Sequence, residues 1–78
     1  MELKDTIELM QSENYKERFK AEYYQAKIRY EKLKNFLEIE FNKEERKSAI
    51  LLLVQQLNIM KMYIDILEQR SLTGNIDL

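Results

Sequence analysis

Nothing in the sequence breaks a helix before Gly74, because the 78-residue chain has no proline and Gly74 is its one glycine. Long helices are therefore the expected structure. Asn14 followed by Glu17 is typical of a helix start, and Asn42 followed by Glu45 repeats the pattern.

The sequence predicts one all-α domain over residues 1–78, an antiparallel two-helix hairpin preceded by a short helix. The expected elements are a short N-terminal helix over about 5–11, a first long helix over about 14–39, and a second over about 43–69. Asp5 is the expected cap of the short helix. The connection at 40–42 is so short that the long helices must run antiparallel. The tail, 71–78, is expected to fray, with Gly74 as the helix stop.

Both long helices carry an apolar stripe whose members are alternately three and four residues apart. The first stripe is Phe19, Tyr23, Ala26, Tyr30, Leu33 and Leu37. The second is Ile50, Leu53, Leu57, Met60, Ile64 and Leu67. This spacing is that of a packing seam, so we expect the two stripes to face each other.

The second long helix has more apolar surface than one partner can cover, since 14 of the 19 residues from Ala49 to Leu67 are apolar. Leu52, Ile59 and Ile66, with Tyr63, would have no second layer above them. We therefore expect a homo-oligomer with this helix at its centre. Burial against a different protein is the alternative. A membrane span is not expected, because polar residues interrupt the helix at Gln55, Gln56, Asn58, Lys61 and Asp65.

Positive charge is concentrated in the first long helix, although the whole chain carries a net charge of -1. Residues 15–34 contain the bases Lys16, Arg18, Lys20, Lys27, Arg29, Lys32 and Lys34 against three acids. Bases with interleaved aromatics suit phosphates and stacked nucleobases. Tyr15 and Tyr24 have the freer rings, because Tyr23 and Tyr30 belong to the stripe. The alternative is a solvated helix face, and the negative net charge counts against duplex DNA as a partner.

Catalysis has little support in the composition. The chain has no histidine and no cysteine, so the commonest general base and the thiolate metal ligands are missing. The one glycine excludes a glycine-rich phosphate loop. We expect no enzyme activity, no cofactor and no metal. The first ten residues lack the pattern of a signal peptide, which predicts a cytoplasmic location.

Three strings of residues resemble a known family. They are Tyr15-x-x-Arg18-x-x-x-Glu22, Lys32-Leu33-x-x-Phe36-Leu37, and Gln56-Leu57-x-x-Met60-Lys61-x-Tyr63-x-x-Ile66-Leu67-x-x-Arg70. They are similar to the short helical phage proteins grouped as crAss-phage-related proteins, a family that includes the phage anti-CBASS sponge. Ala26 and Tyr30 depart from the larger aliphatic residues expected there.

The resemblance implies a hexamer that binds cyclic oligonucleotide immune signals between subunits without cleaving them. It implies that Tyr15 stacks on a base, that a lysine contacts phosphate, and that Arg70 serves a second site. The candidate ligand-binding residues are Tyr15, Arg18, Tyr24, Lys27, Lys32, Lys34 and Arg70. The expected ligand is a cyclic di- or trinucleotide or a cyclic ADP-ribose-type messenger in the host cell cytoplasm. The alternatives are an adaptor that binds a protein through its second long helix and a weak nucleic-acid binder.

Overall fold

The computed structural model describes residues 1–40 and 47–78, and every regular element in those ranges is helical. The elements are a 3-10 turn at Leu3–Thr6, α1 at Ile7–Met10, α2 at Tyr15–Glu40 and α3 at Lys47–Thr73. The all-α prediction is confirmed for these residues. The expected start of the second long helix at 43, its cap at Asn42 and most of the 40–42 connection lie outside the described residues.

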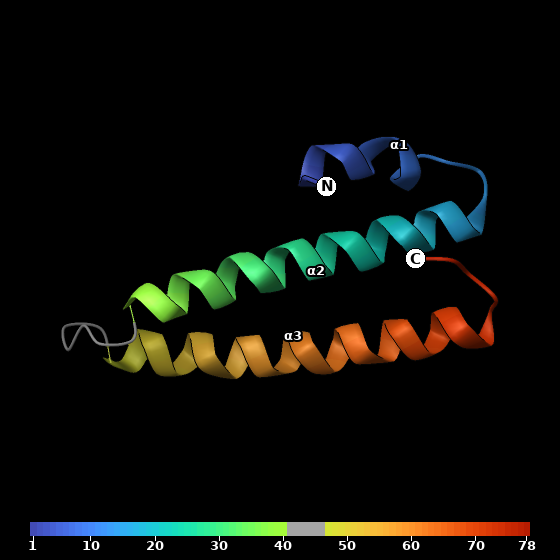
Figure 1. Ribbon diagram of the computed structural model, residues 1–78. Coiled ribbons are helices and arrows are strands. Elements are labelled where there is room, and N and C mark those ends of the chain that lie inside the picture. The colour runs from blue at the N-terminus through green and yellow to red at the C-terminus, as the bar shows by residue number, and fades with distance from the viewer. Residues whose placement is uncertain (41–46) are drawn as a thin grey trace.

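The helices form a single layer with α2 in the middle (Figure 1). α2 contacts α3 along one side and the 3-10 turn and α1 on the other, and α3 runs antiparallel to α2. The molecule measures 47 × 25 × 14 Å. Its smallest dimension is close to the diameter of one helix with its side chains, about 10–12 Å. Within residues 1–40 and 47–78, no second layer therefore covers the helices from above or below.

Asn14 caps the start of α2 as the sequence predicts. Its Oδ1 accepts a hydrogen bond from the Lys16 N–H at 2.9 Å, and its carbonyl accepts one from the Glu17 N–H at 3.1 Å. An asparagine side chain at this position satisfies a backbone donor that has no partner within the helix. The absence of Gly and Pro then lets α2 continue through 26 residues to Glu40.

The end of α3 differs from the expectation that residues from 71 onward fray. The helix continues to Thr73, and the Ile76 N–H donates to the Ser71 carbonyl at 2.9 Å. The residue in the left-handed conformation is Asn75, with φ of 54°, whereas Gly74 keeps a negative φ. This is the geometry of a Schellman motif, which satisfies the last carbonyls of a helix. The chain then turns back, and Ile76 packs against the core.

The core lies in the seam between α2 and α3. Its centre consists of Phe19, Tyr23, Ile64 and Leu67, all at most 7% exposed. All the residues of the two apolar stripes are buried or half-buried, so the spacing identified the seam correctly.

The N-terminal segment begins earlier than expected and is only partly α-helical. It starts with the 3-10 turn at Leu3, and the Glu2 N–H donates to Asp5 Oδ2 at 2.8 Å. Asp5 is therefore the third residue of the turn, and Glu2 occupies the cap position. The expectation that Asp5 itself is the cap is wrong. Buried Thr6 fixes the segment to α2, because its Oγ1 accepts a hydrogen bond from Gln25 Nε2 at 2.9 Å.

The side of α3 opposite α2 is apolar and exposed. Leu52 is 67% exposed, Ile59 65%, Met62 64% and Ile66 56%. Among the described residues, α3 is also the one helix long and apolar enough to cross a membrane by length and composition alone. A single chain therefore leaves uncovered the surface that the sequence predicted to be in excess.

The seam supplies a matched pair of substitutions, because Ile64 is 3% exposed and Ile39 is 72% exposed. Ile64→Ala removes a buried side chain and leaves a cavity, so we expect a loss of about 2–5 kcal/mol in the free energy of unfolding. Ile39→Ala should change it by less than about 0.5 kcal/mol. Urea unfolding at one fixed protein concentration measures both, and equal effects would show that the seam is placed wrongly.

Candidate ligand-binding surface

The bases of α2 divide between its two edges, because α3 and α1 cover its opposite sides. Lys16, Lys20, Lys27 and Lys34 are four or seven residues apart and share one edge, here called the lysine edge. Arg18, Arg29 and Lys32 share the other, here called the arginine edge.

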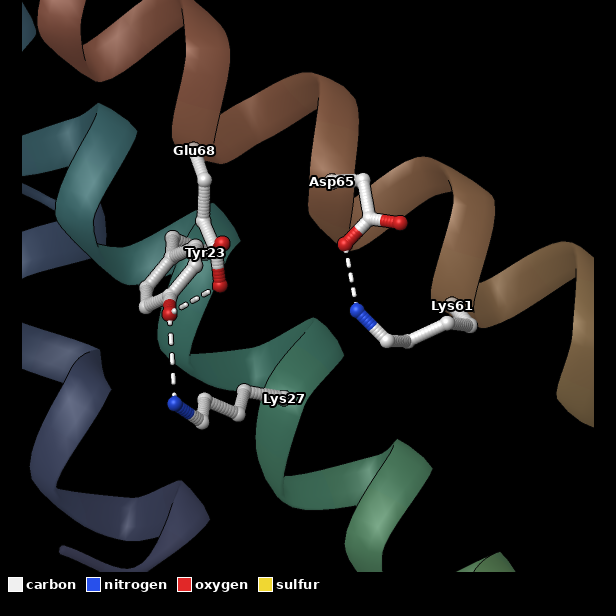
Figure 2. Close-up of polar contacts among 5 residues, drawn as sticks. All are labelled: Tyr23, Lys27, Lys61, Asp65 and Glu68. Carbon is white, nitrogen blue, oxygen red and sulfur yellow. Dashed lines mark hydrogen bonds and ion pairs between the residues drawn. The ribbon is translucent and has the colours of Figure 1, made fainter.

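A hydrogen-bonded group joins α2 to α3 on the lysine edge (Figure 2). The Tyr23 hydroxyl donates to Glu68 Oε1 at 3.0 Å, and Lys27 Nζ donates to the Tyr23 oxygen at 3.3 Å. The same ammonium lies 5.7 Å from the centre of the Tyr23 ring. Burial raises the pKa of Tyr23, and the hydrogen bond to Tyr23 raises the pKa of Lys27. Lys27 therefore stays charged, but part of its bonding capacity is used within the fold.

Lys32 and Lys34 have more freedom than Lys27. Both are exposed, and neither ammonium has a hydrogen-bond or ion-pair partner among residues 1–40 and 47–78. An unpaired lysine can bring three donors and a full charge to a phosphate. On the neighbouring helix, by contrast, Lys61 forms an ion pair with Asp65 (Figure 2).

The arginine edge has its own contacts near the start of α2. Arg18 Nη1 donates to the Ser12 carbonyl at 2.8 Å, which ties Arg18 to the turn before the helix. The guanidinium of Arg70 in α3 lies 5.1 Å from the centre of the Phe19 ring, a cation–π contact. Tyr63 of α3 donates to Glu22 on this edge, and this hydrogen bond raises the pKa of Tyr63.

The two candidate aromatics have different surroundings. Tyr15 is the first residue of α2 and is 60% exposed, so its ring can accept a stacked base. Tyr24 is half-buried and packs against the core, with its ring edge-on to Tyr23 at a centroid distance of 5.1 Å. Its ring is less accessible than the sequence suggested, because one side of it packs against Tyr23 and the core.

An open groove of about 500 Å³ lies on the outer side of α3 near its C-terminal end. Its lining residues are Asp65, Ile66, Gln69, Arg70, Thr73 and Gly74. The groove offers one cation, one carboxylate and an apolar floor. Its volume is in the range of small-molecule sites, about 300–1,000 Å³.

The structure gathers some of the candidate residues and separates others. Tyr15, Arg18 and Arg70 lie at one end of the molecule, since Arg70 rests on Phe19 next to Arg18. Lys34 is 19 residues along α2 from Tyr15, a rise of about 28 Å. One small ligand cannot contact both ends of this set within one chain.

The candidate ligand-binding residues chosen from the sequence do not include Lys16 and Lys20, which share the lysine edge with Lys27. Their spacing of four and seven residues was the signal that could have found them. The candidate residues also do not include Glu68, whose role depends on the seam between the helices. Among the described residues, no group of three or more acidic side chains is placed to hold a metal ion.

The hydrogen bonds of Tyr23 predict a specific pH dependence. Tyr23→Phe removes the hydroxyl that joins Lys27 to Glu68, so we expect a loss of about 0.5–1.5 kcal/mol of stability for each hydrogen bond at pH 7. The folded-state pKa values of Tyr23 and Lys27 are raised above their ordinary values of 10.0 and 10.5. Their contribution is therefore complete below pH 10 and is lost as the pH rises through the folded-state values.

Urea unfolding between pH 7 and 11 tests this expectation. The stability difference between the wild type and Tyr23→Phe should be constant to about pH 9 and shrink above about pH 10. Tyr24→Phe is the control, because the Tyr24 hydroxyl has no hydrogen-bond partner among the described residues. A difference that grows with pH would contradict the network.

Comparison with known proteins identifies the family but gives no close relative. Neither a curated protein nor a solved structure shows significant similarity to the chain. The family model described as Sequestin matches residues 13–71, which include α2 and nearly all of α3. The name is consistent with a protein that sequesters a molecule. Because the match covers well over half of the chain, this protein belongs to the Sequestin family.

Proposed function

We propose that this chain is a phage anti-defence protein that binds a cyclic nucleotide immune signal of the host and sequesters it without cleaving it. The observation that carries the proposal is membership of the Sequestin family over residues 13–71. This range contains all seven candidate ligand-binding residues, from Tyr15 to Arg70. The resemblance to the anti-CBASS sponge supplies the class of ligand, a cyclic di- or trinucleotide or a cyclic ADP-ribose-type messenger.

The exposed groups suit such a ligand. Tyr15 offers a ring for stacking, and base–aromatic stacking contributes roughly 1–3 kcal/mol for each base. Lys32 and Lys34 have unpaired ammonium groups for phosphate, and hydrogen bonds between charged groups are the strong ones. Capture requires only that these contacts form, with no bond in the ligand broken.

Binding without catalysis agrees with the composition of the chain. It has no histidine and no cysteine, so a serine nucleophile would have no histidine to activate it. The lysines with raised pKa values, Lys27 and Lys61, are held charged by their partners. A charged ammonium is a poor general base and a good phosphate ligand. We therefore propose stoichiometric capture in place of turnover.

The binding site is proposed to lie between subunits of a homo-oligomer. Tyr15 and Lys34 are about 28 Å apart along α2, so a small ligand that contacts both of these residues must take one of them from a second chain. The exposed apolar side of α3 supplies a reason for chains to associate. A hexamer, as the resemblance implies, is the proposed assembly.

Association in water is favoured over insertion of α3 into a membrane. α3 is paired along its length with α2, which carries seven bases within residues 15–34. Tyr63 and Glu68 of α3 are hydrogen-bonded to α2. Moving α3 into a bilayer would either carry those charges with it or break these contacts, and both are costly. We propose a cytoplasmic protein on this basis.

Calorimetry tests capture directly. Titration with cyclic dinucleotides, cyclic trinucleotides and cyclic ADP-ribose isomers should find one that binds tightly and is recovered chemically unchanged after heat denaturation of the protein. Tyr15→Ala should weaken binding by roughly 1–3 kcal/mol, and Tyr15→Phe should retain it because the ring remains. Lys32→Ala or Lys34→Ala should reduce both the affinity and its dependence on salt. No binding across the panel would favour the adaptor alternative.

Light scattering tests assembly. At micromolar concentration the wild type should be larger than a monomer. Ile59→Glu should reduce its size, because it places an unpaired charge in an apolar contact. Ile39→Glu is the matched control, since Ile39 is 72% exposed and lies on α2, away from this surface. A wild-type monomer, or recovery of the protein with membranes, would contradict the proposed assembly.

A further inference from the structure

The outer side of α3 carries a second heptad stripe, distinct from the one that packs on α2. The outer stripe consists of Leu52, Gln55, Ile59, Met62, Ile66 and Gln69, with alternating steps of three and four residues. All six residues are exposed in the single chain. Alternate steps of three and four mark the contact line of paired helices. The stripe from Ile50 to Leu67 faces α2, and the outer stripe lies on the opposite side of α3. α2 therefore leaves the outer stripe open to another helix.

The two glutamines distinguish the possible directions of pairing. If two α3 helices paired in parallel and in register, Gln55 would face Gln55 of the second copy and Gln69 would face Gln69. Each amide would then meet an amide that both donates and accepts hydrogen bonds. In an antiparallel pair the glutamines would instead face Leu52 and Ile66, which leaves buried amides without partners. Polar layers of this kind set register in paired helices.

Two charges flanking the outer stripe point to the same direction. Asp65 and Arg70 lie on opposite sides of the stripe and are five residues apart. In parallel paired helices, flanking residues five apart on the two chains meet across the contact line. Asp65 binds Lys61 through Oδ1, so the second carboxylate oxygen of Asp65 in each copy would reach Arg70 of the other. The N–H groups of Arg70 have no hydrogen-bond partner among the described residues, and its guanidinium lies against the Phe19 ring of the same chain.

The open groove lies where these groups would meet. Both Asp65 and Arg70 line it, and Ile66 and Gln69 of the outer stripe form part of its floor. A second α3 placed in parallel register would fill this groove with the same residues of its own. The groove is thus self-complementary, with an acid on one side and a base on the other.

We infer that two copies of this chain associate through the outer stripe of α3, in parallel and in register, with Asp65 of each copy paired to Arg70 of the other. The inference rests on the homo-oligomer of the proposed function and not on its ligand. It assigns Arg70 to an interface, where the resemblance assigns it to a second ligand site. It also predicts that the copies are related by an axis running along α3.

Cysteine cross-linking tests the direction, because the natural chain has no cysteine. Leu52→Cys and Gln69→Cys place single thiols 17 residues apart, about 25 Å along the helix. After mild oxidation without ligand, each variant alone should form a disulfide-linked dimer, because its two thiols face each other. Asn35→Cys, at an exposed position of α2, is the control for random collisions.

The alternatives give different patterns of cross-links. Cross-links that form only when the Leu52→Cys and Gln69→Cys proteins are mixed would show antiparallel pairing and overturn the inference. Cross-linking no faster than that of Asn35→Cys would show that copies do not meet here. Ligand binding is measured separately, so a chain that captures a nucleotide but fails to cross-link retains the proposed function and loses only this interface.

Charge reversal tests the ion pair in the Gln69→Cys background. Asp65→Arg or Arg70→Asp alone should lower the rate of cross-linking severalfold, because like charges then meet across the contact line. The double variant, Asp65→Arg with Arg70→Asp, should restore it. Failure of the double variant to restore the rate would show that these two residues do not meet, and would overturn the pairing.

Discussion

The rest of the structure depends on the seam between α2 and α3, because it is where two long helices bury apolar surface against each other. Ile64 and Leu67 of α3 pack against Phe19 and Tyr23 of α2. Tyr23 adds direction to this contact, since its hydroxyl donates to Glu68 at 3.0 Å. Packing supplies most of the stability, and the hydrogen bond fixes which turns of the two helices meet. The seam therefore determines which sides of α2 and α3 are buried and which are exposed.

One consequence of the seam is a flat molecule in which the lysine edge and the arginine edge of α2 lie on the two broad faces. α2 is covered by α3 on one side and by the N-terminal segment on the other, as Figure 1 shows. Its bases are left on two opposite edges, where a ligand can approach from solvent. The edges are not equivalent. On the lysine edge Lys27 is engaged with Tyr23, whereas on the arginine edge Arg18 supports the turn at Ser12.

A second consequence is that the outer side of α3 has no partner within the chain. Burying a side chain such as Ile59 contributes about 1.5–3 kcal/mol when it is complete, so this surface favours association of some kind. The end of the same helix is closed by backbone hydrogen bonds. The Schellman motif at Asn75 holds Gly74 close to the Arg70 carbonyl, and Ile76 returns to the core. This arrangement keeps Arg70 at a definite place beside the groove and above Phe19.

The sequence by itself determined the helices and their inward faces. The absence of Pro and internal Gly, the cap at Asn14 and the steps of three and four residues are local or periodic signals, and each identified its feature. The excess apolar surface at Leu52, Ile59 and Ile66 was equally visible, because composition records it directly. The sequence also showed that the first long helix is basic and aromatic. It did not show which of these side chains are free of contacts within the fold.

Only the tertiary structure decided which side chains are occupied within the fold. Lys27 and Lys34 look alike in the sequence, but Lys27 lies beside Tyr23 and Glu68 while Lys34 has no partner among the described residues. The Tyr24 ring is half-buried because it packs edge-on against Tyr23 at the core, and the Arg70 guanidinium lies against the Phe19 ring. These outcomes depend on contacts between residues up to 51 positions apart, as between Phe19 and Arg70. A helical period describes one element, whereas such contacts are set by how the elements pack.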